Sequence, residues 1–126
     1  GLNVDYSMNS AINQSGDQGN PLSQGKQLPY VPKHKIHTQG NIQNGPYKIY
    51  IQQQWTSERY VTTDNQSLLA SYNLWDMGLT YAFDWKGKLK GNLGFHTNNI
   101  FNVDYQVVRL RSMPGRNFQF NLNVVL

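Results

Sequence analysis

The sequence lacks several features that would point to common protein classes. It has no cysteine, which excludes a disulfide framework and a thiolate metal site. Charged residues make up only 14% of the 126 residues, well below the share of about a quarter in average globular proteins. No run of about 20 apolar residues occurs, and apolar residues never keep helical spacing over three turns. The sequence therefore predicts neither a transmembrane helix nor a helical domain.

Basic residues give the chain a formal net charge of +4, but they are scattered and form no long run. Such a distribution is typical of solvated loop charges, and we expect no nucleic-acid partner. Amides replace the missing charges, because Asn and Gln together make up about a fifth of the residues. Any polar face in this protein is therefore built mainly from neutral hydrogen-bonding groups.

The last ten residues, NFQFNLNVVL, alternate apolar and amide side chains with a period of two. This period predicts a strand with one apolar and one polar face. Five further stretches have strand character, and they join into an antiparallel meander. The six expected strands cover residues 2–12, 35–43, 47–56, 71–85, 89–97 and 117–126.

The connections between these strands alternate in length: long, short, long, short, long. NGP at 44–46 and KGK at 86–88 predict the tight turns, which puts all the long loops at the opposite end of the sheet. Transmembrane β-barrels have this asymmetry, with an apolar outer band and a polar lumen. The sequence therefore predicts an all-β segment of a large transmembrane β-barrel. Tyr81, Phe83 and Trp85, just before a tight turn, fit an aromatic girdle at the membrane interface.

The same pattern leaves a second hypothesis open, namely a soluble β-sandwich or small barrel that serves as a binding module. Under this hypothesis the module binds carbohydrate and uses Trp55, Trp75 and Trp85 as stacking platforms. An isolated barrel segment has unpaired strand edges, so it is expected to self-associate, whereas a soluble module should stay monomeric without detergent. This difference separates the two hypotheses.

Four motifs, in this order, resemble the C-terminal part of a TonB-dependent outer-membrane receptor. They are LPYVPKH at 28–34, SERY at 57–60, NNIFNVDY at 98–105 and MPGRNF at 113–118. The resemblance extends over nearly the whole chain, and the amide-rich style is similar to receptors from the Bacteroidetes. It identifies residues 1–126 as the C-terminal part of the barrel, without the plug and most of the strands.

The resemblance implies a barrel of about 22 strands in the bacterial outer membrane, closed around a plug. Such a receptor imports a scarce nutrient, namely a siderophore, cobalamin, haem or a glycan, when TonB pulls on the plug. The implied partners are the rest of the barrel and its plug, TonB through that plug, outer-membrane lipid and the barrel assembly machinery. The alternating C-terminal strand is the implied assembly signal, formed by Phe118, Phe120, Leu122, Val124 and Leu126.

No residue pattern supports catalysis, a cofactor or a metal site, and we expect the protein not to be an enzyme. GNPLSQGK at 19–26 differs from a P-loop in glycine spacing and lacks the Ser or Thr after Lys. His34 and His37 are predicted on opposite faces of a strand, so they would not chelate one ion together. The long loops offer a small set of candidate ligand-facing residues: Arg59, Tyr60, Asp64, Tyr105, Arg109 and Arg111.

Overall fold

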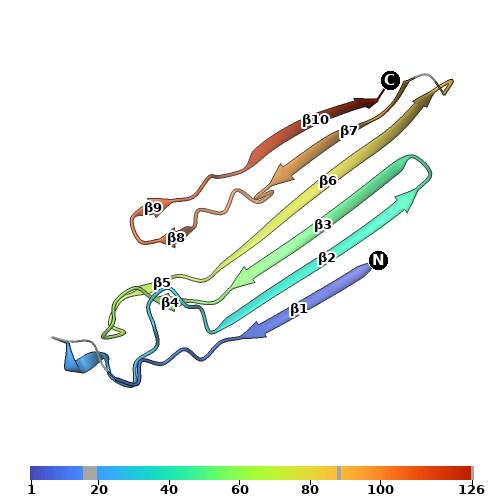
Figure 1. Cartoon of the computed structure of the whole chain (residues 1–126). Coiled ribbons are helices and arrows are strands. Elements are labelled where there is room, and N and C mark those ends of the chain that lie inside the picture. Colours follow the sequence, from blue (N-terminus) through green and yellow to red (C-terminus); the bar gives the residue numbers. More distant parts are fainter. Residues whose placement is uncertain (16–19, 88, 126) are drawn as a thin grey trace.

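A computed structural model describes residues 1–15, 20–87 and 89–125. Its main feature is one antiparallel sheet of six strands in the order β1-β2-β3-β6-β7-β10 (Figure 1). Two small two-stranded sheets, β4-β5 and β8-β9, lie in the connections. The elements are β1 Leu2–Met8, the 3₁₀ turn η1 Pro21–Ser23, β2 His34–Asn44, β3 Tyr47–Thr56, β4 Arg59–Tyr60, β5 Leu68–Leu69, β6 Tyr72–Trp85, β7 Leu89–Asn98, β8 Gln106–Val108, β9 Arg111–Ser112 and β10 Asn117–Val125.

The predicted meander is confirmed, with two corrections at its start. The first strand ends at Met8 rather than near residue 12, because residues 11–13 pair with residues 26–28 of the following loop instead of with β2. The loop that follows contains η1, although no helical turn was predicted there. Strand β3 covers the predicted range, Tyr47–Thr56. The other strands begin and end within one or two residues of the predicted limits.

The tight turns gather at one end of the sheet and the long connections at the other (Figure 1). Gly45 has φ +55° in the β2–β3 turn, and Lys86 and Gly87 have φ +53° and +72° in the β6–β7 turn. These left-handed values explain why a glycine stands in each turn. Lys88, predicted in the second turn, and Gly16, in the first long loop, lie outside the described residues.

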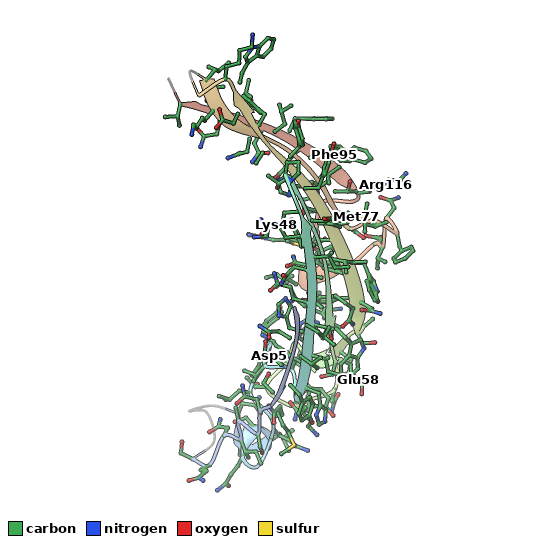
Figure 2. All side chains as sticks on the ribbon, turned by 90° about the vertical axis from the view of Figure 1, so that its right-hand side faces the viewer. Asp5, Lys48, Glu58, Met77, Phe95 and Arg116 are labelled. Atoms are coloured by element: carbon green, nitrogen blue, oxygen red, sulfur yellow. The ribbon has the colours of Figure 1, made fainter. Side chains whose placement is uncertain are left out.

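The sheet is curved, and its two faces differ in chemistry. In Figure 2, Met77 and Phe95 lie on the convex side and Asp5 and Lys48 on the concave side. Residues paired across antiparallel strands share a face, so the register extends this division over the whole sheet. One convex row is Ile42, Ile49, Leu79, Phe95 and Phe120, and the neighbouring concave row is Asn41, Tyr50, Gly78, His96 and Gln119.

No hydrophobic core lies inside the part of the chain that the structure describes. Leu69, at 8% exposure, is its only buried apolar side chain, and no second layer of described elements packs on the six-stranded sheet. The described residues therefore form neither the sandwich nor the small closed barrel of the alternative hypothesis, since β1 and β10 stay unpaired with each other at the two edges. The sheet leaves its apolar convex face open to its surroundings.

Candidate functional site

The concave face of the sheet is a wall of amide, aromatic and imidazole side chains joined by hydrogen bonds. Gln52 Nε2 donates to Asp76 Oδ2 at 2.8 Å across β3 and β6. The backbone N–H of Asn99 donates to Asp76 Oδ1 at 2.7 Å, and Asn98 Nδ2 donates to Asn117 Oδ1 at 2.9 Å. Since most of these groups are neutral, the wall offers donors and acceptors without a strong net charge.

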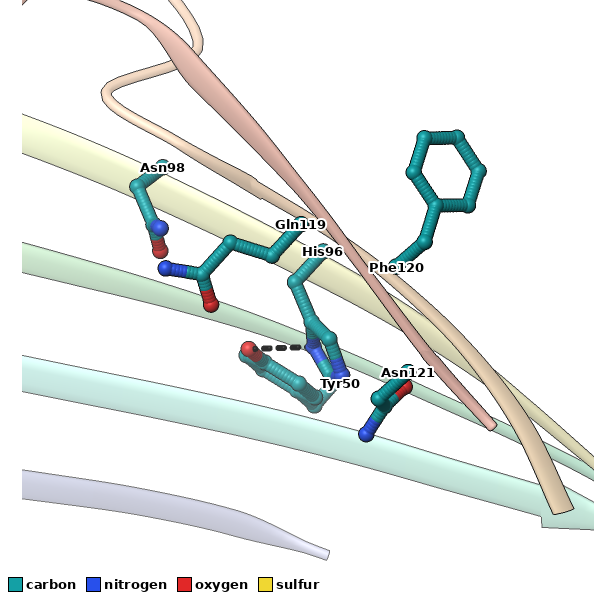
Figure 3. A pocket seen from close by; sticks show the side chains of 6 residues that line it. All are labelled: Tyr50, His96, Asn98, Gln119, Phe120 and Asn121. Atoms are coloured by element: carbon teal, nitrogen blue, oxygen red, sulfur yellow. Dashed lines mark hydrogen bonds between the residues drawn. The ribbon is translucent and has the colours of Figure 1, made fainter. Parts of the chain in front are cut away.

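A hollow of about 560 Å³ lies on this wall. Tyr50 and His96 meet there, with the hydroxyl and Nδ1 3.1 Å apart in a hydrogen bond and the ring centroids 5.7 Å apart (Figure 3). The amides of Asn98, Gln119 and Asn121 point to the same side, whereas Phe120, which also borders the hollow, points away from it (Figure 3). The hollow can therefore bind polar groups through hydrogen bonds.

Two glycines beneath the hollow make this arrangement sterically feasible. A Cβ on Gly78 would lie 2.2 Å from Tyr50 Cε1 and 2.5 Å from His96 Nδ1. A Cβ on Gly94 would lie 1.7 Å from Asn121 Oδ1. The missing side chains let the Tyr50 ring and the Asn121 amide lie directly over the neighbouring strand.

The convex face carries an apolar band with aromatic side chains at both margins. Tyr81, Phe83 and Trp85 lie on this face at the turn end, as the register requires, and Tyr47 joins them with its ring centroid 5.0 Å from that of Tyr81. Trp75 lies near the loop end of the same face, where its ring meets Phe101 edge to face at 6.4 Å. The interface role of Tyr81, Phe83 and Trp85 stays a prediction.

The distance between these margins matches the thickness of a membrane. Along β6, the ten residue steps from Trp75 to Trp85 span roughly 33 Å at about 3.3 Å each. A strand tilt of about 35–45°, usual in transmembrane barrels, reduces this to roughly 23–27 Å, against an apolar band of about 25 Å. Trp55 also lies on the convex face, so the three tryptophans proposed as stacking platforms share the face that carries the apolar band.

Four residues of the predicted assembly signal lie on the convex face of β10 and are exposed: Phe118, Phe120, Leu122 and Val124. The fifth, Leu126, lies outside the described residues. The alternation that predicted one shared face is therefore confirmed for the described four. Their role as a signal stays a prediction.

Arg59, predicted among the ligand-facing residues, is instead buried, with 4% of its surface exposed. Its Nη2 donates to the carbonyl oxygens of Gln106 and Val107, and its guanidinium lies 5.2 Å from the centre of the Tyr72 ring. These contacts join the β4-β5 hairpin to the β8-β9 hairpin. Arg59 thus holds two loops together rather than facing solvent.

The other predicted ligand-facing residues are partly or fully exposed. The Asp64 carboxylate accepts hydrogen bonds from the Thr62 side chain and from the Gln66 backbone amide. Together these two bonds lower the pKa of Asp64. Tyr105 packs on Tyr72 with ring centroids 4.9 Å apart, and burial raises the pKa of Tyr105. Arg109 and Arg111 are exposed at the tip of the β8-β9 hairpin, while Tyr60 is half-buried.

Replacing Arg59 with Met should release the β8-β9 hairpin from the β4-β5 hairpin. Hydrogen bonds from a charged donor contribute about 1.5–3 kcal/mol, so local opening should become roughly 10- to 100-fold more frequent. Trypsin cleavage at Arg109 and Arg111, followed by mass spectrometry on the full-length protein, measures this opening. The control Arg116→Met removes an exposed guanidinium that lies over Phe118. Equal cleavage rates in the two variants would contradict the linking role of Arg59.

The structure brings together residues that the sequence analysis did not connect. Tyr50 meets His96 across three strands, and Gln52 meets Asp76. Asn99, 4% exposed, exchanges two 2.8 Å hydrogen bonds with the Val103 backbone inside the NNIFNVDY motif. The two asparagines that open this motif, Asn98 and Asn99, could have indicated a turn from the sequence. Asn is common at left-handed backbone positions, and the φ of Asn99 is +51°.

Metal-binding clusters and membrane-spanning helices are both absent from the described residues. In the part of the chain that the structure describes, no three His, Asp or Glu side chains cluster so as to hold a metal ion. His34 and His37 lie on opposite faces of β2, as predicted. Among the described residues, no helix is long and apolar enough to cross a membrane.

Comparisons with known proteins identify the fold. No protein-family model and no curated protein sequence matches the chain. The similar solved structures include three in which the match covers 98% of the chain: the ferric citrate transporter FecA in its unliganded form (TM-score 0.83, 17% identity), the ferric preacinetobactin receptor BauA from Acinetobacter baumannii (0.72, 16%) and the ferric yersiniabactin uptake receptor FyuA from Yersinia pestis (0.66, 15%). The chain spans only 20%, 19% and 20% of these structures, respectively. It therefore has the fold of a segment of these receptors, an antiparallel all-β meander of six strands.

Proposed function

We propose that the chain is the C-terminal part of the barrel of a TonB-dependent outer-membrane receptor. The observation that carries this proposal is the chemical difference between the two faces of a single sheet that has no hydrophobic core of its own. The convex face is apolar between two aromatic margins, whereas the concave face is a hydrogen-bonded polar wall. Lipid outside and a wet lumen inside would match these two faces.

The proposed receptor imports a scarce nutrient with energy supplied through TonB, and it is not an enzyme. The names of the three similar structures, which handle ferric citrate, ferric preacinetobactin and ferric yersiniabactin, favour a ferric chelate over cobalamin, haem or a glycan. The exposed cations Arg109 and Arg111 at a loop tip suit an anionic chelate. The similarity to receptors from the Bacteroidetes stays a prediction.

The partners follow from the surfaces that the sheet leaves open. The outer edges of β1 and β10 have no partner strand among the described residues, and the remaining strands of the barrel would pair with them. The polar wall around Tyr50 and His96 would face the plug, and the apolar face would meet outer-membrane lipid. The barrel assembly machinery would recognise β10. The isolated chain, with both edges open, is expected to self-associate.

The ligand proposal can be tested on the full-length protein in detergent. Replacing both Arg109 and Arg111 with Ala should weaken binding of anionic ferric chelates roughly 2- to 30-fold, because exposed ion pairs contribute about 0.2–1 kcal/mol each. Isothermal calorimetry with ferric citrate and with a ferric siderophore measures the change. Arg116→Ala, on an exposed cation beside Phe118, is the matched control.

The outcomes separate the two parts of the proposal. Unchanged affinity in the double variant would remove the β8-β9 tip from the ligand site. Recovery of the full-length protein in the soluble fraction rather than in outer membranes would overturn the receptor assignment itself.

A further inference from the structure

A second hollow, of about 410 Å³, lies on the convex face of the sheet over β6, β7 and β10. Phe120, on its border, is 81% exposed, so the hollow is an open groove rather than an enclosed cavity. Its convex side chains belong to two neighbouring rows of paired residues, and all of them are apolar or aromatic: Leu79, Tyr81, Leu93, Phe95, Phe120 and Leu122.

One cation lies beside this otherwise uncharged face. In the described parts of the six strands, no position on the convex face carries Lys, Arg, Asp or Glu. Arg116 lies on the convex side, one residue before β10 begins (Figure 2). Its side chain is exposed, and no carboxylate of the described residues lies within ion-pair distance of it. Arg116 therefore offers an uncompensated positive charge at the loop-end margin of the apolar band.

A row of aromatic rings connects this cation to the groove. The Arg116 guanidinium lies 6.0 Å from the centre of the Phe118 ring. Phe118 stacks on Phe95 with ring centroids 6.0 Å apart and planes at 11°, and the Phe95 centroid lies 4.8 Å from that of Phe120. The surface between the charge and the groove is therefore continuously apolar.

The length of this surface matches one leaflet of a membrane. The six residue steps from Arg116 to Leu122 span roughly 20 Å at about 3.3 Å each. A strand tilt of about 35–45° reduces this to roughly 14–16 Å along the membrane normal, which is half of a hydrocarbon core of about 30 Å. With the charge at the membrane surface, the groove lies near the midplane, where an acyl chain of the outer leaflet ends.

We propose that Arg116 and the groove form a binding site for one anionic, phosphate-bearing lipid of the outer leaflet. Arg116 binds the phosphate, because a guanidinium can form two parallel hydrogen bonds to a phosphate group. One acyl chain follows the rings of Phe118 and Phe95 and ends in the groove. This inference rests on the proposed function, which assigns the convex face to lipid and the loop end to the cell exterior. It adds a preferred headgroup and a defined place on the barrel wall.

The shape of the sheet disfavours a second copy of the chain as the occupant. The groove lies on the convex side of a curved sheet (Figure 2). Two convex surfaces touch only along a narrow strip, whereas a stable protein interface buries about 1,200–2,000 Å². A flexible acyl chain can follow the same surface without this restriction.

The test measures lipid retention by native mass spectrometry of the full-length protein, purified from outer membranes in detergent. The probes are phosphatidylglycerol, which is anionic, and phosphatidylcholine with the same acyl chains, which has no net charge. One lipid should be retained per protein, with roughly 5-fold preference for phosphatidylglycerol. Arg116→Gln should remove this preference, whereas Arg116→Lys should keep it. The control Lys48→Gln removes an equal charge from the concave side and should also keep it (Figure 2).

A second pair of variants tests the groove itself. Leu93→Trp places a bulky ring in the groove and should abolish the retention of the single lipid. Ile49→Trp is the matched control, because Ile49 is 48% exposed, Leu93 is 49% exposed, and both lie on the convex face. Its lipid retention should equal that of the unchanged protein.

Three outcomes would overturn the lipid site. They are equal retention of the two lipids by the unchanged protein, unchanged retention in Leu93→Trp, and a protein dimer that carries no lipid. Because the protein used has already been recovered from outer membranes, each of these outcomes leaves the receptor assignment intact.

Discussion

Arg in place of Leu122 is expected to destabilise the folded full-length barrel by about 2–4 kcal/mol, whereas Arg in place of Asn123 should cost far less. Leu122 lies on the convex face and is 64% exposed in the isolated sheet, opposite Leu93. Asn123 lies on the concave face, opposite Asn92. A cation near the membrane midplane loses its hydration, while a cation in a wet lumen keeps it. The heat-modifiable folded band in outer membranes measures the difference.

These two neighbouring positions are a matched pair, because they share a strand, a partner strand and a mutant side chain. They differ in the native residue and in the face of the sheet on which it lies. Equal losses of folded protein for Leu122→Arg and Asn123→Arg would contradict the lipid-facing assignment of the convex surface. Loss at Leu122 alone would support it and would also exclude a general intolerance of β10 to charge.

The strands were predictable from the sequence because their information is local. Alternation in NFQFNLNVVL specifies a strand and its two faces without reference to any other part of the chain. The glycines of NGP and KGK specify the tight turns, since φ is positive at Gly45 and Gly87. The resemblance of the four motifs then indicated a barrel segment, and the fold of the similar structures agrees.

The side-chain pairs of the site were not predictable because they depend on register. Tyr50 and His96 are 46 positions apart, and they meet only because Gly78 pairs with both through the sheet. The burial of Arg59 has the same origin, since its acceptors lie on the separate β8-β9 hairpin. From the sequence alone, an Arg side chain in a loop is expected to be exposed, because the position of the neighbouring loop that buries it is not known. The strands of the loop hairpins have only two or three residues each, which is too short to show a detectable alternation.

Gly91 provides the sharpest test of the sheet packing. A Cβ there would lie 2.2 Å from the backbone oxygen of Asn123 and 2.7 Å from Phe83 Cζ. Gly91→Ala is expected to destabilise the full-length protein by about 1–3 kcal/mol, the usual cost of overpacking. Denaturant unfolding followed by tryptophan fluorescence measures the change.

Gly40→Ala is the matched control, since Gly40 lies in the interior of β2 and a Cβ there would meet only Ile51 Cγ2 at 3.7 Å. Ala is better than Gly in a strand interior by roughly 0.5–1 kcal/mol, so this variant should be neutral or slightly more stable. Phe83→Ala should not rescue Gly91→Ala, because the shorter contact is to the β10 backbone, which cannot rotate away. Rescue by Phe83→Ala would show that the aromatic ring, and not the close approach of β7 to β10, requires glycine at this position.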